Sequence, residues 1–255
     1  MTRASDTPSL SVDGHIATIR LRRPGQANRL GPQDLDVLRE HLDAVNANDA
    51  VRVLRILSEG KYFCSGYDIS SLASDSAPSS LYFGQTMDLI EAARPVTIAA
   101  VQGGAYGGGT DLCLACDFRI GTPQADMFMP ATRLGLHFYA GGMSRYVTRL
   151  GLAQAKRLFL TAERIQADEM LRIGFLTELV PEDRLQDRLD ALSAQIVAMA
   201  PIPLFGVKAQ LNRIARGEID HAGIEQAVLR SEQSEDLAEG ARAWKEKRAP
   251  NFTGR

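Results

Sequence analysis

The stretch Val101–Asp117 reads VQGGAYGGGTDLCLACD, and the rest of the chain is best understood from it. An apolar, β-branched run over 96–101 leads into a segment where five of seven residues are glycine. Leu112, Leu114 and Ala115 then follow at helical spacing. The pattern predicts a strand, a glycine turn and a helix. The first N–H groups of such a helix have no partner within it, and the helix dipole adds partial positive charge.

Such a helix start can hold a phosphate or the oxygen of a reacting carbonyl. The phosphate interpretations fit poorly, because no Gly-Lys-Ser/Thr follows the glycines and their spacing never forms GxGxxG. We therefore expect an oxyanion hole, with the carboxylate of Asp111 one helical step inside the helix.

The composition is that of an ordinary globular protein, with 255 residues, 45% hydrophobic, 24% charged and a net charge of −2. This balance gives no reason to expect nucleic acid or a membrane surface as a partner. Three cysteines form no disulfide framework and no metal site, which indicates a reducing compartment. Neither a signal peptide nor a membrane span is evident, so we expect a cytoplasmic protein.

Strands and helices alternate along the first half of the chain. A hairpin is predicted over 9–21 around Asp13-Gly14, a helix from Gly31-Pro32 to about Val45, and a buried strand over 51–57. The segment 70–80 is predicted to be a mobile loop, and a helix over 81–93 precedes the strand 96–101. Short strands are predicted over 118–121, 127–129 and 177–180. The alternation predicts an α/β layered fold.

From residue 184 onward only helices are predicted, over 184–199, 203–216, 221–231 and 235–247, with Pro201 and Pro203 at a break. We therefore divide the chain into an α/β core, 1–200, and a helical region, 201–255.

Four motifs occur in register with those of a known family. They are GKYFCSGYDI at 60–69, the glycine stretch 101–117, Arg23-Pro24 with Asn28 and Leu30, and the terminal segment 244–255. Together they resemble the crotonase, or enoyl-CoA hydratase/isomerase, superfamily over nearly the whole chain. The resemblance implies a spiral of ββα units followed by helices that drive trimerisation, commonly into a dimer of trimers. It implies a lyase or isomerase of fatty acid metabolism that acts on an acyl-CoA thioester, with no cofactor besides the coenzyme A of the substrate.

By matching positions, the oxyanion hole is expected at the backbone N–H groups of Tyr67 and Gly108. Preorganised donors stabilise the negative charge that develops on a thioester oxygen. The resemblance also implies a set of coenzyme A contacts: Arg23, Ala27, Asn28, Arg29, Ser65, Gly66, Asp68, Ile69, Lys245 and Lys247. For Arg23 the alternative is a solvated side chain, and for Asp68 a role in orienting the following helix. Lys245 and Lys247 are expected to act from a neighbouring subunit, or else to form an exposed helix end.

The chain departs from the family at the two carboxylates with which typical hydratases activate a water. Asp111 matches the first and can still act as an acid or base, although its side chain is one methylene shorter. Ala131 matches the second and carries no acid. His137 and Tyr139 lie nearby, where most hydratases of the family lack them. An imidazole can both donate and accept a proton, so His137 could supply the missing acid. Tyr139 could orient a substrate carboxylate or donate a proton. Both could instead simply shape an acyl pocket.

Three functions remain open at this stage. The first is an enoyl-CoA hydratase/isomerase type of enzyme with Asp111 as acid or base. The second keeps the oxyanion hole for a double-bond isomerase, a decarboxylase or a C–C hydrolase, and Ala131 favours it. The third is a coenzyme A-binding protein without turnover. Cys64, Cys113 and Cys116 are expected to be small buried side chains rather than nucleophiles or a redox pair.

Overall fold

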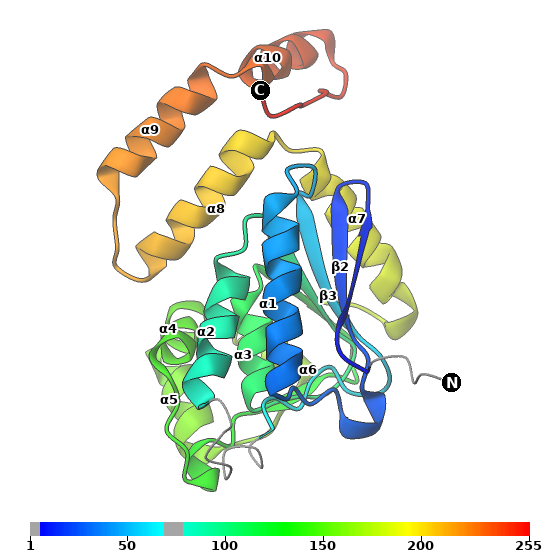
Figure 1. Ribbon diagram of the computed structural model, residues 1–255, viewed down its shortest axis with the longest axis vertical. Coiled ribbons are helices and arrows are strands. Elements are labelled where there is room, and N and C mark those ends of the chain that lie inside the picture. Colours follow the sequence, from blue (N-terminus) through cyan, green and yellow to red (C-terminus); the bar gives the residue numbers. More distant parts are fainter. Residues whose placement is uncertain (1–5, 69–78) are drawn as a thin grey trace.

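The computed structural model describes residues 6–68 and 79–255. Ile69, a predicted coenzyme A contact, lies outside the described residues, as does most of the loop predicted over 70–80. A central sheet carries six strands in the order β1, β2, β3, β4, β6, β9 (Figure 1). Their bounds are Ser9–Asp13, Ile16–Leu21, Val53–Ser58, Val96–Val101, Phe118–Gly121 and Glu178–Leu179. Strand β1 is antiparallel to β2, and the others pair in parallel.

The first hairpin differs by one residue from the prediction. Asp13 pairs with Ile16, so the two turn residues are Gly14 and His15 rather than Asp13 and Gly14. The turn moves because Gly14 is the residue with positive φ, +54°, which glycine adopts at little cost.

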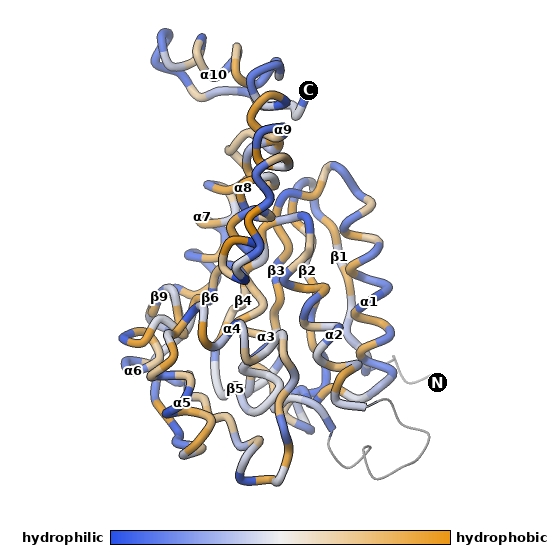
Figure 2. The backbone as a smooth tube through the Cα atoms, turned by 90° about the vertical axis from the view of Figure 1, so that its left-hand side faces the viewer, coloured by the Kyte–Doolittle hydropathy of each residue, from blue (hydrophilic) through white to orange (hydrophobic). Residues whose placement is uncertain are grey.

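Helices cover both faces of the sheet. The first face carries α1 (Pro32–Ala47), α2 (Ser80–Glu91) and α3 (Gly108–Ala115), and the opposite face carries α7 (Leu185–Val197). Alternation along β4 divides its side chains between the two layers: Ile98 packs with α7, and Ala99 packs with the helices of the other face. The inner strands β3 and β4 are largely hydrophobic (Figure 2), as expected for strands buried on both sides. The predicted α/β layering is confirmed.

A small second sheet links the two glycine motifs to the following chain. It consists of β5 (Ala105–Tyr106), β7 (Asp126–Phe128) and β8 (Ile165–Gln166), in that order. Isolated bridges join Leu30 to Tyr67 and Cys64 to Ala105. The remaining elements of this part are η1 (Pro24–Gln26), η3 (Thr132–Leu134), α4 (Ala140–Leu150), α5 (Leu152–Thr161), α6 (Ala167–Arg172) and η4 (Glu182–Arg184). Through these pairings the segments at 27–30, 64–67 and 105–108 lie side by side.

The chain ends in an arm of three helices, α8 (Pro201–Ala215), α9 (His221–Glu232) and α10 (Glu235–Glu246), which extends away from the sheet (Figures 1 and 2). Pro201 opens α8, where its missing N–H removes no helical bond. Within the described residues no single helix is long and apolar enough to cross a membrane; 182–197 and 201–215 meet that criterion only as a pair, bent by 107°.

Candidate functional site

The glycine turn ends where α3 begins. Gly107 is the N-cap and has φ +51° and ψ −122°, a conformation open to glycine alone. No side chain caps the helix. The N–H of Gly108, the first helical residue, therefore has no partner within the helix and lies at the positive end of the dipole.

The second turn touches the first. Gly66 has φ +90°, and a Cβ placed on it would lie 2.6 Å from the nitrogen of Gly108 and 2.8 Å from the carbonyl oxygen of Tyr106. A Cβ on Gly109 would lie 2.1 Å from the carbonyl oxygen of Cys64. Only glycine permits so close an approach of the two main chains. The structure thus brings the turn at Gly66-Tyr67 directly against the start of α3, as the two-donor arrangement requires.

A cavity of about 370 Å³ opens beside the two turns. Tyr67, Gly107 and Gly108 contribute to its wall. Its other lining residues are mainly apolar and aromatic, and include Phe83, Phe128, Met129, Leu134, Leu136 and Phe138. A few polar side chains complete the wall: Arg29, Ser65, Asp68, Ser80, Tyr106, His137 and Tyr139. Apolar walls with a few convergent polar groups are typical of small-molecule sites.

Several predicted coenzyme A contacts gather at this cavity. The Ser65 N–H donates to the Ala27 carbonyl (2.9 Å), and the Leu30 N–H donates to the Gly66 carbonyl (2.9 Å). Arg29 forms an ion pair with Asp68 at 3.3 Å. The segments 27–30 and 65–68 therefore act as one paired unit beside the oxyanion turns.

Arg23 and Asn28 are engaged inside the protein. Arg23 donates two hydrogen bonds to the buried carboxylate of Asp34, at 2.6 and 3.0 Å. Asn28 is 1% exposed, and its side chain bonds the N–H of Arg23 and the carbonyls of Glu59 and Tyr62. Their side chains shape the loop that presents Ala27 and Arg29, which is a structural role.

Lys245 and Lys247 lie at the end of α10, at the far end of the arm from the cavity (Figure 1). They do not meet the cavity within one protomer. A contact with coenzyme A from a neighbouring subunit stays a prediction.

Asp111 lies in the first turn of α3, fully buried, and does not line the cavity. Arg145 donates to both of its oxygens, from Nε to Oδ1 at 2.8 Å and from Nη2 to Oδ2 at 2.7 Å. The Tyr139 hydroxyl donates to Oδ2 at 2.6 Å. Ala131, in contrast, does line the cavity. The role of Asp111 as acid or base stays a prediction, and its carboxylate is held by three hydrogen bonds.

His137 lines the cavity and is exposed. Its Nδ1 lies 2.8 Å from the carbonyl oxygen of Phe138. A carbonyl oxygen only accepts, so Nδ1 carries the proton and Nε2 of the neutral ring is the acceptor. The imidazole therefore offers a base at the cavity wall.

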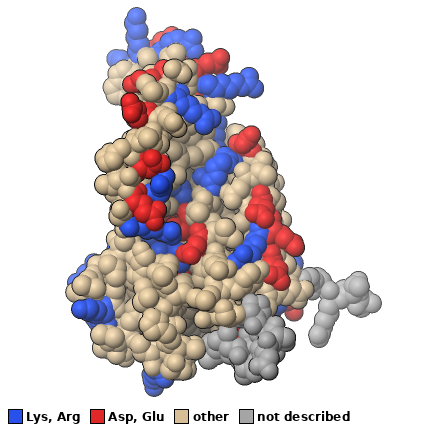
Figure 3. All heavy atoms as spheres, turned by 60° about the vertical axis from the view of Figure 1, so that its left-hand side comes forward, with Lys and Arg blue, Asp and Glu red and all other residues tan. Residues whose placement is uncertain are grey.

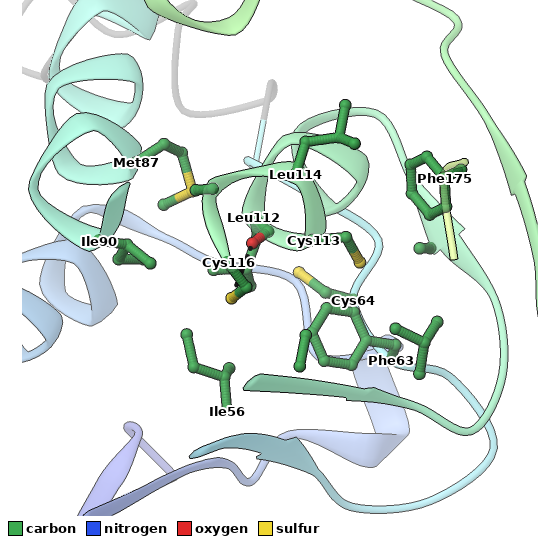
Figure 4. Packing of buried hydrophobic residues seen from close by; sticks show 14 of the residues in the cluster. Ile56, Phe63, Cys64, Met87, Ile90, Leu112, Cys113, Leu114, Cys116 and Phe175 are labelled. Atoms are coloured by element: carbon green, nitrogen blue, oxygen red, sulfur yellow. Dashed lines mark hydrogen bonds between the residues drawn. The ribbon is translucent and has the colours of Figure 1, made fainter. Parts of the chain in front are cut away.

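The three cysteines are buried thiols, as predicted. Figure 4 shows Cys64, Cys113 and Cys116 among the apolar side chains between α3, α2 and the sheet. Burial raises the pKa of Cys64 and that of Cys116 to about 12, so neither is a ready nucleophile. No group of three or more His, Cys, Asp or Glu side chains in the described part of the chain is arranged to hold a metal ion.

The sequence-based predictions missed Arg145, Phe83 and Gly84. Phe83 packs on Tyr67, with ring centroids 5.5 Å apart, and a Cβ on Gly108 would lie 2.6 Å from the Phe83 ring. A Cβ on Gly84 would lie 2.5 Å from the Tyr139 ring. Arg145 is 1% exposed. The signal that could have found Arg145 is its position on the apolar face of a short helix. A cation buried on such a face requires carboxylate partners.

Comparison with known proteins agrees with this geometry. The family model described as "Enoyl-CoA hydratase/isomerase" matches residues 12–255. Crotonyl-CoA hydratase of Syntrophomonas wolfei is 34% identical, over 95% of this chain and 96% of its own. Carnitinyl-CoA dehydratase of Proteus mirabilis is 30% identical, over 98% of this chain and 100% of its own. The crystal structure of an enoyl-CoA hydratase from Bacillus anthracis matches with a TM-score of 0.89 at 31% identity, covering 98% of this chain and 100% of that one.

Proposed function

The chain belongs to the enoyl-CoA hydratase/isomerase family, and from that premise we propose that it transfers protons at the acyl group of a coenzyme A thioester. The observation that carries the proposal is the contact between the turns at Gly66-Tyr67 and Gly107-Gly108 beside an apolar cavity. A thioester oxygen that takes up negative charge as an enolate forms is stabilised by two such backbone donors. One such donor lowers the activation free energy by on the order of 3 kcal/mol.

The first candidate reaction is hydration of an α,β-unsaturated acyl-CoA, or the reverse dehydration. The relatives named as crotonyl-CoA hydratase and carnitinyl-CoA dehydratase support it. In this scheme His137 is the proton-transferring group at the cavity wall, since Nε2 is its free acceptor. The oxyanion turns stabilise the enolate, and the aromatic wall excludes bulk water from it.

A second candidate is a double-bond isomerisation, a decarboxylation or a C–C hydrolysis on the same scaffold. Two observations favour it: Ala131 stands in the cavity wall without an acid, and Asp111 is bound by Arg145. Such reactions require only one proton-handling group near the acyl chain.

The coenzyme A of the substrate is proposed to be the only cofactor involved. A place in fatty acid metabolism is proposed on the match to the enoyl-CoA hydratase/isomerase family. A cytoplasmic location is proposed on the three free, buried cysteines, which suit a reducing compartment.

The assembly is proposed to be a homotrimer or a dimer of trimers that forms through the arm. Between α8 and α9 lies an apolar groove of about 400 Å³. Val207 and Leu211 beside it are 56% and 59% exposed, and Trp244 on α10 is 87% exposed. In Figure 3 separate acidic and basic side chains interrupt an uncharged surface along the arm. An apolar surface of this extent on a protruding element suits a second copy of the chain.

The substitution Gly66→Ala tests the oxyanion turns. Its Cβ would have to push the Gly108 nitrogen away, so we expect kcat to fall by about 100-fold or more on the best acyl-CoA substrate. Gly174→Ala is the matched control, because Gly174 also has positive φ, +82°, yet its nearest Cβ neighbour is the Arg149 carbonyl oxygen at 3.5 Å. Because φ is positive at both positions, each substitution also adds backbone strain. Equal rates for the two variants would contradict the proposal.

The substrate panel that separates the candidates contains 2-enoyl, 3-enoyl, malonyl-type and β-keto acyl-CoAs, with products identified by mass spectrometry. Water addition to 2-enoyl-CoA alone supports the first candidate. Products from another member with no hydration support the second. Tight binding by calorimetry with no product from any member would point to a coenzyme A-binding protein without turnover.

A further inference from the structure

Asp111 and Tyr139 form a pair between α3 and the cavity. Tyr139 lines the cavity and Asp111 does not, so the tyrosine separates the carboxylate from the space beside it. The Tyr139 hydroxyl donates to Oδ2 of Asp111 at 2.6 Å, and Arg145 occupies both oxygens of the same carboxylate. A carboxylate that already binds a guanidinium through two hydrogen bonds is a fixed anchor for a third donor.

Arg145 is itself held by two further carboxylates. Its Nη1 donates to Asp88 at 2.6 Å and to Glu91 at 3.1 Å, both on α2. Glu91 also accepts from Arg149 at 3.1 Å and from Arg216. Three carboxylates and three guanidinium groups thus balance one another in a network whose inner members, Asp111, Arg145 and Glu91, are buried. Because Arg145 is 1% exposed and has a partner on each side, it can adopt few other positions.

The ring of Tyr139 is fixed as firmly as its hydroxyl. It stacks on Phe138, with centroids 4.3 Å apart. A Cβ on Gly84 would lie 2.5 Å from the ring, and one on Gly142 would lie 2.8 Å from it. Two glycines on different helices therefore leave just enough room for the aromatic ring.

The Tyr139 hydroxyl has a single proton, and it uses that proton in its hydrogen bond to Asp111. Burial and the adjacent Asp111 carboxylate raise the pKa of Tyr139 well above its ordinary value, so the phenol keeps that proton. Within 6–68 and 79–255, no group donates a hydrogen bond to the Tyr139 oxygen. The oxygen thus retains its capacity to accept, and it has no proton left to donate toward the cavity.

We propose that Asp111 and Arg145 are positioning residues that turn the Tyr139 proton away from the acyl group. The Tyr139 oxygen then accepts a hydrogen bond from a hydroxyl group of the acyl chain or from a water molecule beside that chain. The inference rests on the proposed function, because it places an acyl-CoA in the cavity. It selects acyl groups that carry a hydroxyl over those that carry a free carboxylate, since a carboxylate would meet the tyrosine as acceptor against acceptor.

Binding of two probes tests this selection, with the ligand recovered after each titration and checked by mass spectrometry, because a 3-hydroxyacyl-CoA can itself be dehydrated in the first candidate reaction. Titration calorimetry compares 3-hydroxybutyryl-CoA with butyryl-CoA, which differs only in lacking the hydroxyl. We expect the wild-type protein to bind the hydroxylated probe roughly 3- to 10-fold more tightly, the effect of one neutral hydrogen bond. Because the readout is a ratio, a general loss of folded protein does not change it.

Tyr139→Phe removes the acceptor and should bring the ratio close to 1 while butyryl-CoA still binds. Asp111→Ala frees the tyrosine proton, which the phenol can then donate toward the cavity, so malonyl-CoA should gain affinity relative to butyryl-CoA when this variant is compared with wild-type protein. The double variant should not show this gain, because the gain requires the Tyr139 hydroxyl. A full 3-hydroxybutyryl-CoA ratio in Tyr139→Phe would overturn the inference. So would an unchanged malonyl-CoA ratio in Asp111→Ala.

Gly84→Ala provides a variant that keeps every charge and every hydrogen-bonding group. Its Cβ must displace the Tyr139 ring, so the ratio should fall although alanine favours the helix. Gly240→Ala on α10 is the control, since its Cβ would lie 3.6 Å from Phe252, an ordinary contact. A full ratio in Gly84→Ala would count against the inference. If wild-type protein binds neither probe, the proposed function fails too; if it binds both equally, only the inference fails.

Discussion

At the scale of single residues, burial decides what an arginine contributes. The side chain of Arg145 is 1% exposed and forms ion pairs with Asp111, Asp88 and Glu91. The side chain of Arg157 is 32% exposed and forms ion pairs with Glu163 and Glu169. Arg145→Met should lower the free energy of unfolding by about 3–5 kcal/mol, because it leaves the buried Asp111 carboxylate without its cation. Arg157→Met should lower the free energy of unfolding far less, because solvent screens these ion pairs. Urea unfolding at neutral pH measures both; equal losses would contradict this reasoning.

The sequence alone predicted the glycine turn and the helix that begins after it with Asp111 in its first turn, because glycine motifs and helix starts are local patterns. It could not give the partner of Asp111. Arg145 reaches that carboxylate from α4, 34 positions further along the chain, and only the packing of α4 on α2 and α3 brings it there. Side-chain partners of this kind depend on tertiary structure, which no local period encodes.

At the scale of elements, strands β4 and β6 have the predicted bounds, and the four C-terminal helices begin and end within a few residues of the predicted ones. The two-residue strands β5 and β8 were not predicted. Both are too short to show an alternating pattern. Strand β5 forms where the glycine turn brings Ala105 beside Met127, and β8 forms where Ile165 pairs with Met127 from the other side of β7. The small sheet that supports the site therefore depends on tertiary pairing.

The C-terminal tail is held on α10 by a buried carboxylate. Asp236 is 2% exposed and accepts from the N–H groups of Thr253 and Gly254, at 2.7 and 2.9 Å. Asp236→Asn replaces one acceptor by a donor, so the tail should detach more readily, with the free energy that holds it on α10 lowered by about 1–3 kcal/mol. Carboxypeptidase B should then release Arg255 faster than from wild-type protein. Asp187→Asn, at an exposed site on α7, is the control and should leave the rate unchanged. Unchanged release from Asp236→Asn would show that the tail is held otherwise.

At the scale of the whole molecule, the core and the arm differ in how their apolar residues are used. Leucines and isoleucines of the sheet layers are almost fully buried, but α9 has no buried residue and α8 buries only Pro201. A helix pair that buries so little within its own protomer gains little stability from it. The sequence indicated helices here; that their apolar faces turn outward became evident only from the structure.

The assembly proposed for the arm predicts a charge-sensitive interface at Leu211. Leu211→Glu would place a carboxylate in the apolar groove between α8 and α9, and burying it against another copy would cost several kcal/mol. Light scattering after size exclusion should therefore show a shift from the trimer or hexamer toward a monomer. Leu160→Glu is the control: Leu160 is 71% exposed on α5, away from the arm, and should leave the mass unchanged. If Lys245 and Lys247 serve a neighbouring subunit, the dissociated variant should also bind acyl-CoA more weakly. An unchanged mass for Leu211→Glu at micromolar concentration would refute an interface through this groove.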